Sequence, residues 1–272
     1  MNLAEYHRHP AWSPSALKCA ITGTMRAFNH RYGPDAAPFV ATDDMNRGSL
    51  VDCLMTPPFD LRGMFAAYKT INRSIKEGKA NYNEAIEKGL IPITYDTASQ
   101  ARAIKATLES DPEVGPILAV MDRGASQAPH FWADAASRHC RQLPDIITMN
   151  GGLYELKKAR SAKPKNFYRQ AMDLAYDLQM AHLTLGFEDL YGHPPDEVGI
   201  IAFEWEPPFD CSLLILSADD LALGLEKREE AFRRIAECQA SGIWPSHGRR
   251  PFRPERATVA PLTIDPDSIA LF

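Results

Sequence analysis

The stretch RHCRQLPDIITMNGGLYELK, residues 138–157, decides the fold. Residues 138–147 are typical of one strand, and residues 153–157 are typical of a second strand that returns beside it. The Asn-Gly-Gly sequence at 150–152 is a turn signal between the two strands. The stretch therefore predicts a β-hairpin.

Three polar residues are brought together by this hairpin. Side chains alternate along a strand, so Glu155 and Lys157 share one face while Leu156 points into the core. The returning strand can then bring Glu155 beside Asp145, which follows a proline. We expect two carboxylates and one ammonium group to converge here.

This combination of groups suits a divalent-metal phosphodiester hydrolase. Carboxylates are hard oxygen ligands for Mg²⁺, with Mn²⁺ as the alternative ion, and the backbone carbonyl of Leu156 could add another ligand. A bound ion activates water and assists the leaving oxygen, while Lys157 can orient or deprotonate that water and stabilise charge on the phosphate. The same residue types also occur as a solvated face in many domains, so the pattern alone leaves both interpretations open.

The composition fits one elaborated globular domain. The chain has 272 residues, of which 45% are hydrophobic and 24% are charged, and no repeat or low-complexity linker divides it. No apolar run reaches the roughly 20 residues of a membrane helix, so we expect no membrane partner. The N-terminus lacks the pattern of a secretion signal, which predicts a cytoplasmic protein. Five scattered cysteines without a Cys-x-x-Cys pair argue against a zinc ribbon or iron–sulfur cluster.

Basic residues follow the acidic group along the chain. The net charge of −5 does not suggest a protein coated in nucleic acid, yet residues 156–172 contain six cations and no acid. A local patch of this kind can steer and hold a phosphate backbone, although charge clusters are also common as solvated faces. We expect DNA contacts from six residues, namely Lys158, Arg160, Lys163, Lys165, Arg169 and Tyr176. A second basic cluster near the C-terminus comprises Arg249, Arg250, Arg253 and Arg256.

Helical and strand patterns both occur in the rest of the chain. Apolar spacing and capping residues predict helices over 16–28, 47–55, 81–88, 97–109 and 218–240. Further strands are expected at 130–133, 198–205 and 211–216. The chain is therefore expected to be an α/β (α+β) protein with a central mixed sheet flanked by helices. We divide it into a mainly helical N-terminal part (1–125), a catalytic core (126–245) and a C-terminal tail (246–272).

The longest helical pattern lies between the hairpin and the later strands. Its apolar stripe consists of Phe167, Ala171, Leu174, Leu178, Ala181 and Leu185. A neighbouring stripe at steps of three and four includes Tyr176 and Gln179. If this helix packs behind the hairpin, both side chains face the metal site and can hold substrate phosphates or the attacking water. The alternative is a surface stripe on a core helix.

Six motifs occur in a fixed order between about Ser13 and Trp244. They are Gly48-Ser49-Leu50-Val51-Asp52, Phe131-Trp132-x-Asp134, Cys140-Arg141-x-x-Pro144-Asp145, Glu155-Leu156-Lys157, Tyr176-x-x-Gln179 and Gly242-x-Trp244-Pro245. This order resembles the PD-(D/E)xK nuclease domain of the RecE type, the exonuclease VIII group. That group is related more distantly to lambda exonuclease and the RecB nuclease domain. The resemblance implies a restriction-endonuclease-like core with a helical N-terminal part.

The resemblance also implies an activity. It is that of a magnesium-dependent exonuclease, which degrades one strand of linear double-stranded DNA from its 5′ end and leaves a 3′ single strand. A single-strand annealing protein would use that strand in DNA recombination, in a bacterial or phage-infected cell. Relatives tend to form rings around DNA, which implies a homo-oligomer. Asp145 and Glu155 then correspond to the metal-binding acids, Lys157 to the catalytic lysine, and Gln179 with Tyr176 to the motif of the following helix.

Several positions depart from the family pattern. Asp52 lies where these nucleases usually have a histidine, and its harder oxygen suits Mg²⁺ at least as well, which implies activity with an altered metal preference. Three carboxylates would then converge and repel one another without a cation. Gln127, Lys158 and Leu183 stand where relatives often carry an acid, a hydroxyl residue and a tyrosine.

Two other functions fit the same sequence. One is a catalytically weakened DNA-end-binding protein or recombination scaffold, and the other is a nuclease with a single-strand or structure-selective substrate. The C-terminal residues 264–272 combine acids with apolar residues, as a docking tail would, but a frayed terminus or a packed extension gives the same pattern.

Overall fold

A computed structural model of the chain describes residues 3–37, 41–56 and 61–247. The second basic cluster, at 249–256, and the candidate docking tail at 264–272 lie outside the described residues. Of the helices in the described ranges, none has both the length and the apolar character needed to span a bilayer.

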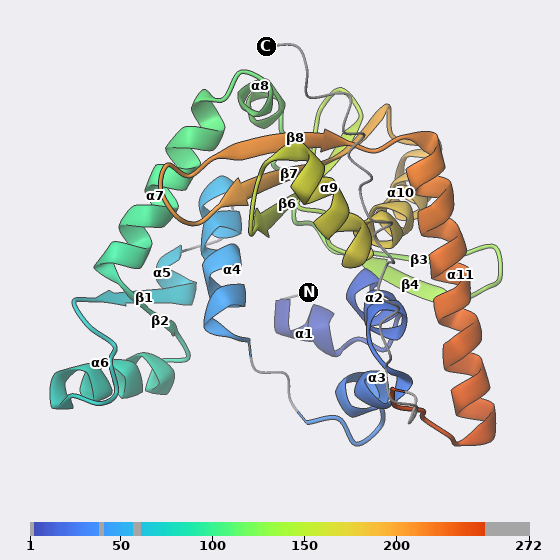
Figure 1. The fold of residues 1–272 in the computed structure, drawn as a ribbon, viewed down its shortest axis with the longest axis horizontal. Coiled ribbons are helices and arrows are strands. Elements are labelled where there is room, and N and C mark those ends of the chain that lie inside the picture. Colours follow the sequence, from blue (N-terminus) through green and yellow to red (C-terminus); the bar gives the residue numbers. More distant parts are fainter. Residues whose placement is uncertain (1–2, 38–40, 57–60, 248–272) are drawn as a thin grey trace, which may run out of the picture.

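A four-stranded mixed sheet forms the centre of the molecule (Figure 1). Its strands, in spatial order, are β5 (Ile146–Ile147), β6 (Gly152–Ala159), β7 (Glu197–Glu204) and β8 (Cys211–Ile215). Strands β6 and β7 are parallel, and the two outer pairs are antiparallel. A parallel pair needs a crossover connection, which α9 (Pro164–Asp173) and α10 (Tyr176–Tyr191) supply. The predicted mixed sheet flanked by helices is confirmed.

Helices cover both faces of this sheet. On one face, α9 and α10 pack against Leu153 of β6 through a core that includes Phe167 and Met180. On the other face, α4 (Asp43–Met55) and α7 (Tyr95–Ser110) belong to the core that contains Leu156. Because side chains alternate along β6, its odd-numbered residues face the α9 and α10 layer.

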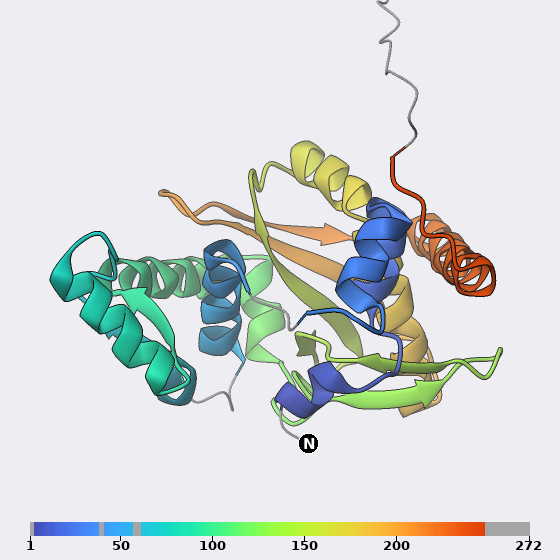
Figure 2. The same cartoon turned by 90° about the horizontal axis from the view of Figure 1, so that it is seen from below.

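Further helices and two short sheets complete the fold. The remaining helices are α1 (Leu3–Arg8), α2 (Pro14–Thr22), α3 (Met25–Tyr32), α5 (Leu61–Met64), α6 (Lys76–Glu87), α8 (Val114–Ala119) and α11 (Ala218–Ser241). A parallel pair that was not predicted is formed by β1 (Phe65–Tyr68) and β2 (Ile91–Thr94). An antiparallel pair is formed by β3 (His130–Ala133) and β4 (His139–Gln142). In Figure 2, α6 and the β1–β2 pair lie at one end of the molecule and α11 lies at the other.

The long hairpin predicted from residues 138–157 is wrong, because its first strand is interrupted. Strand β4 pairs with β3, and only the two residues of β5 pair with β6. The break occurs at Pro144, because a proline has no N–H group to contribute to a sheet ladder. Its carbonyl instead accepts a hydrogen bond from the Gln127 N–H at 2.8 Å. The interruption leaves Asp145 just before β5, at the edge of the sheet.

Two predicted helices are each divided in the structure. The long helical pattern breaks between α9 and α10 at Ala175, whose left-handed φ of 51° interrupts the helical ladder. As a result, Leu174 is 41% exposed and does not belong to the expected apolar stripe. The predicted N-terminal helix ends before Gly23 and restarts after Thr24, whose hydroxyl accepts from the Ala27 N–H at 3.0 Å.

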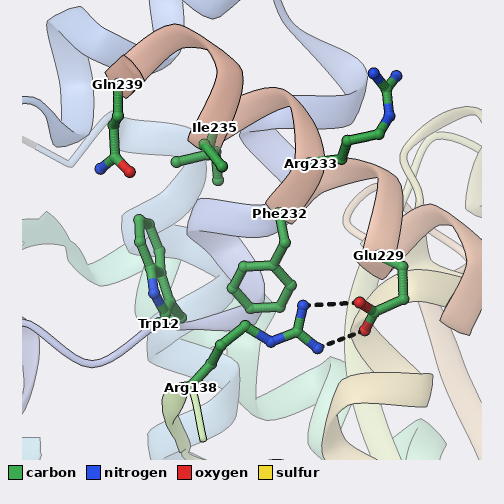
Figure 3. Close-up of a pocket in the computed structure, with 8 residues that line it drawn as sticks. Trp12, Arg138, Glu229, Phe232, Arg233, Ile235 and Gln239 are labelled. Carbon is green, nitrogen blue, oxygen red and sulfur yellow. Dashed lines mark hydrogen bonds and ion pairs between the residues drawn. The ribbon is translucent and has the colours of Figure 1, made fainter. Parts of the chain in front are cut away.

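Helix α11 holds the β3–β4 pair through paired charges (Figure 3). Arg138 donates to both oxygens of Glu229, at 2.7 and 2.6 Å, and its guanidinium lies 3.9 Å from the centre of the Phe232 ring. The buried Arg228 of α11 pairs with Asp134 at 2.7 Å. We call Asp134, Arg138, Arg228 and Glu229 the balanced cluster, because it contains two acids and two cations.

Candidate active site

Asp145 and Glu155 meet beside the short β5 strand. The backbone N–H of Asp145 donates to Oε1 of Glu155 at 3.1 Å, and the Leu156 N–H donates to Oδ2 of Asp145 at 3.0 Å. Each carboxylate therefore accepts a hydrogen bond from a backbone N–H group at or next to the other acid. These contacts lie next to Pro144, where the regular sheet ladder is interrupted. The structure brings together the two acids that the sequence predicted to converge.

Lys157 completes this group from the same face of β6. Its Nζ atom lies 2.5 Å from Oε2 of Glu155 and 3.5 Å from Oδ2 of Asp145. Burial acts to lower the pKa of Lys157, but the two neighbouring carboxylates outweigh it and raise the pKa above its usual range. In this arrangement the lysine is a charged hydrogen-bond donor, so it can orient water or stabilise phosphate charge but has no lone pair to accept a proton.

Three acids stand around Lys157, and ionising all of them together is unfavourable. Glu155 is 2% exposed, and burial together with the Asp145 charge raises its pKa to about 7. Asp52 lies on α4, beside these residues. Burial is the largest cause that raises the pKa of Asp52 well above its usual range, and the charges of Asp145 and Glu155 act in the same direction. We call Asp52, Asp145, Glu155 and Lys157 the carboxylate cluster.

The donor atoms of this cluster are of the type that binds a hard divalent cation. The Asp145 charge raises the pKa of both Asp52 and Glu155, which is the electrostatic condition that a bound cation would relieve. The N–H and C=O groups of one strand residue point toward the same neighbouring strand. Because the N–H group of Leu156 reaches Asp145, the carbonyl of Leu156 also points toward the side of β6 on which Asp145 lies. The residues therefore fit Mg²⁺ or Mn²⁺.

The cluster is nevertheless not preformed as a set of metal ligands. Across the described parts of the chain, no three His, Cys, Asp and Glu side chains form a group that could hold a metal ion as they stand. In this arrangement the Oε2 atom of Glu155 accepts hydrogen bonds from both Lys157 and Gln179.

Helix α10 faces the carboxylate cluster, which is one of the two arrangements that the sequence left open. Gln179 donates from Nε2 to Oε2 of Glu155, and the centre of the Tyr176 ring lies 5.9 Å from Nζ of Lys157. The break at Ala175 starts α10 in the orientation that presents these two side chains to β6. Their alternative interpretation as a surface stripe is wrong, because both are partly buried and directed at the cluster.

Two residues around the cluster have roles that sequence reasoning missed. Lys18 of α2 donates from Nζ to Oε1 of Gln179 at 2.8 Å, and its ammonium lies 4.3 Å from the centre of the Tyr176 ring. Gln127, which departs from an expected acid, donates from Nε2 to Oδ1 of Asp145 at 2.8 Å. No local pattern marks either residue, because each partner is distant in sequence.

Leu183, the last of the four departures from the family pattern, packs in an apolar core. It is 1% exposed and belongs to the core formed by α9, α10 and β7. A tyrosine hydroxyl at this position would need a hydrogen-bond partner inside an apolar core, whereas leucine fits without one.

Four of the six residues expected to contact DNA share one groove. A hollow of about 760 Å³ between the end of β6 and α9 is lined by Lys158, Arg160, Arg169 and Tyr176, among others. Two acids, Asp44 and Asp173, also line it, and Lys158 pairs with Asp44. Lys163 and Lys165 are exposed at the start of α9 and do not line this groove.

The hollow in Figure 3 is a separate feature of the structure. It has a volume of about 450 Å³ and is lined by Trp12, Arg138, Phe232 and neighbouring residues of α11. None of the residues of the carboxylate cluster lines it. Because Arg138 is already paired with Glu229, this hollow presents no free cation from the balanced cluster.

Comparisons with known proteins agree with this geometry. A family model described as "PDDEXK-like domain of unknown function (DUF3799)" matches residues 13–250. Among solved structures, a crystal structure described as "Putative exonuclease" from Eubacterium rectale matches with a TM-score of 0.63 and 16% identity. That match covers 93% of this chain and 95% of the other. No curated protein matches the sequence. The PD-(D/E)xK fold expected from the motifs is confirmed, and the more specific RecE type stays a prediction.

Proposed function

Because the chain belongs to the PDDEXK-like family, we propose that it is a divalent-metal-dependent DNA exonuclease. The observation that carries the proposal is the convergence of Asp145, Glu155 and Lys157 at one edge of the sheet. We further propose 5′-to-3′ digestion of linear double-stranded DNA, which yields 3′ single strands for recombination. Polarity and substrate rest on the resemblance to RecE-type nucleases.

The metal would be held by oxygen atoms of the carboxylate cluster. Asp52, Asp145, Glu155 and the Leu156 carbonyl are the ligands we assign to Mg²⁺, with Mn²⁺ as an alternative. When bound, such an ion supplies a more acidic water and neutralises charge that develops on the phosphate.

The side chains around the metal site would orient the reacting groups. Lys157 is charged and can donate a hydrogen bond to the attacking water or to a phosphate oxygen. Gln179 holds the Glu155 carboxylate, and Gln127 holds the Asp145 carboxylate at 2.8 Å. These amides limit the rotation of the two acids, which keeps their oxygens directed at one point.

The groove beside the cluster supplies a path for the DNA strand. Lys158, Arg160 and Arg169 can contact phosphates there, and Tyr176 offers an aromatic face near the cluster. Lys163 and Lys165 would extend this positive surface along the start of α9.

The test of this function is digestion of linear duplex DNA labelled at its 5′ or 3′ end, with Mg²⁺, Mn²⁺ or EDTA. We expect loss of the 5′ label that requires the metal and is abolished by Lys157→Ala. Lys88→Ala is the matched control, because the Lys88 side chain is exposed and pairs with Glu84 on the surface of α6. Cleavage by folded Lys157→Ala at the wild-type rate would refute the assignment. Circular, nicked and single-stranded substrates in the same assay would identify a structure-selective or single-strand nuclease.

A catalytically weakened DNA-binding scaffold is the second candidate function. It is favoured by one observation, namely that Lys157 and Gln179 already occupy Oε2 of Glu155. A gel shift beside the nuclease assay separates the two candidates. The scaffold predicts retained duplexes with no metal-dependent product, whereas the exonuclease predicts shortened strands.

The proposed assembly and setting follow from the family resemblance. We propose a ring-shaped homo-oligomer on double-stranded DNA ends, with a single-strand annealing protein as partner, in the cytoplasm of a bacterial or phage-infected cell. Light scattering at the working concentration tests the first part, and a monomer would count against the ring.

A further inference from the structure

Lys18 is an ammonium group placed next to the carboxylate cluster without an acid of its own. It comes from α2, in the N-terminal helical part, and packs its amine over the Tyr176 ring at 4.3 Å. Among the ion pairs in the described residues, none involves Lys18. Burial and the nearby Lys157 charge lower the pKa of Lys18 to about 7, and the Glu155 charge acts in the opposite direction. In the part of the chain that the structure describes, the single hydrogen-bond partner of the Lys18 Nζ atom is Oε1 of Gln179, at 2.8 Å.

This hydrogen bond decides which way the Gln179 amide faces. An amide has an accepting oxygen and a donating nitrogen, and the two ends have nearly the same shape. In its ammonium form Lys18 can only donate, so that form selects the orientation in which the oxygen of Gln179 points toward α2. The NH₂ group then necessarily points toward Glu155, where it donates to Oε2.

The alternative orientation would be unfavourable at both ends of the amide. The Gln179 NH₂ group would face the Lys18 ammonium, and the Gln179 oxygen would face the Glu155 carboxylate. Both contacts would place like partial charges together in a partly buried site, where electrostatic interactions are strong. Lys18 thus controls a chain of contacts that runs from α2 through Gln179 to Glu155.

We propose that Lys18 is a positioning residue of the nuclease site, acting through Gln179 to hold the Glu155 carboxylate in its working orientation. The inference rests on the proposed function and deepens it, because it makes the N-terminal helix α2 part of the active site. It assigns Lys18 no contact with DNA or metal. A direct contact of Lys18 with a substrate phosphate is the competing explanation, and it would act independently of Gln179.

A double-mutant cycle distinguishes these explanations. Lys18→Met retains the aliphatic chain over Tyr176 but removes the donor, and Gln179→Leu removes the amide. We expect Lys18→Met to lower the single-turnover cleavage rate by about 10-fold, in the range for residues that orient a metal ligand. We expect the same change to cost less than about 2-fold when made in Gln179→Leu, because the chain of contacts is already broken.

Substrate affinity and a matched control supply the remaining readouts. The dissociation constant for DNA should stay within about 2-fold of wild type in Lys18→Met, since a residue without a phosphate contact leaves the binding energy unchanged. Lys88→Met, at an exposed lysine, should behave as wild type. Three outcomes would overturn the proposal. The first is a double variant whose loss in cleavage rate is the product of the two single losses. The others are a Lys18→Met variant that loses only DNA affinity, or one that cleaves at the wild-type rate.

Two additions keep the test decisive. If Lys18→Met does not fold, as judged by circular dichroism, Lys18→Arg replaces it in the cycle, and its partial loss should likewise vanish in Gln179→Leu. If the wild type does not cleave DNA, the proposed function fails, and the same cycle is measured as Mn²⁺ affinity by calorimetry. The positioning role is supported if Lys18→Met, Gln179→Leu and the double variant weaken Mn²⁺ binding equally. It is overturned if the two changes act independently on Mn²⁺ affinity, or if the wild type binds no Mn²⁺.

Discussion

The balanced cluster and the carboxylate cluster use similar side chains in opposite ways. In the balanced cluster, burial acts to raise the pKa of Asp134, but hydrogen bonds from Arg228 and Arg138 outweigh it and lower the pKa to about 2. In the carboxylate cluster, burial and neighbouring acids raise the pKa of Glu155 to about 7. The first group is neutral by pairing, and the second contains three acids and one cation, so full ionisation of its acids is unfavourable.

This difference separates a structural role from a functional one. Charges that are fully paired and hydrogen-bonded fix the position of α11 and the β3–β4 pair, and they require nothing further. Carboxylates gathered around one lysine are costly in the free protein, and a divalent cation would relieve that cost. The carboxylate cluster thus has a destabilising arrangement of charges, and the balanced cluster does not.

The largest expected effect is on cleavage by Glu155→Gln. This change keeps the size and removes the charge of one proposed ligand, so activity should fall by at least about 1,000-fold. The folded state should be as stable as wild type or more stable without metal, because a buried acid with an unfavourable charge is lost. Cleavage kinetics and urea unfolding of the same preparation measure both. A destabilised variant would make Glu155 structural, like Asp134.

The balanced cluster should respond in the opposite way. Arg228→Met removes a buried cation and leaves Asp134 with one partner fewer, which should destabilise the fold by about 3–5 kcal/mol. Arg233→Met, on the same helix but 59% exposed at its side chain, should change stability by less than about 0.5 kcal/mol. Urea denaturation compares the two variants. Activity per folded molecule should stay at the wild-type value in both, and equal stabilities would contradict the comparison.

The two clusters also predict opposite pH dependences of stability. The pKa of Asp134 is lowered from 3.8 to about 2, so its contribution to stability is complete above about pH 4 and is lost as the pH falls toward 2. The pKa of Glu155 is raised from 4.5 to about 7, so the folded state loses stability as the pH rises from about 4.5 through 7.

Unfolding of EDTA-treated protein at several pH values measures this second effect. The stability of Glu155→Gln relative to wild type should increase between about pH 4.5 and pH 8, because only the wild type loses a favourable bound proton. A difference that is constant across this range would show that Glu155 does not carry the predicted charge strain.

The smallest expected effects belong to the groove beside the cluster. Arg169→Ala should weaken DNA binding a few-fold and reduce the slope of log affinity against log salt by about 1, as for one lost phosphate contact. Asp44→Ala should act in the opposite direction, since it frees Lys158 from its ion pair. Fluorescence anisotropy at several salt concentrations measures both. Unchanged slopes would place the DNA elsewhere.

Much of the core site could be predicted from local sequence. The alternation of β6 placed Glu155 and Lys157 on one face, and the step from Tyr176 to Gln179 placed both on one side of α10. These predictions succeeded because strand and helix periodicity are local properties. Asp145 also lay where expected, although the strand that was predicted to carry it is interrupted at Pro144.

The remaining features depended on tertiary structure. Ala175 adopts a left-handed conformation without a glycine or proline to mark it, so the break before α10 leaves no local signal. Lys18 and Gln179 are 161 residues apart, and the pattern of α2 indicates only its buried face with Leu17. Which polar residue of one helix reaches a distant site is decided by packing, which periodicity does not encode.

The most direct test of the central claim is calorimetric titration of Mn²⁺ into wild type, Glu155→Gln and Asp134→Asn near pH 7. The account predicts binding by the wild type with release of a proton, because Glu155 is partly protonated at that pH and must lose its proton to bind the ion. Binding should be lost in Glu155→Gln and retained in folded Asp134→Asn. Wild-type protein that binds no Mn²⁺, or binding that survives Glu155→Gln unchanged, would contradict the account.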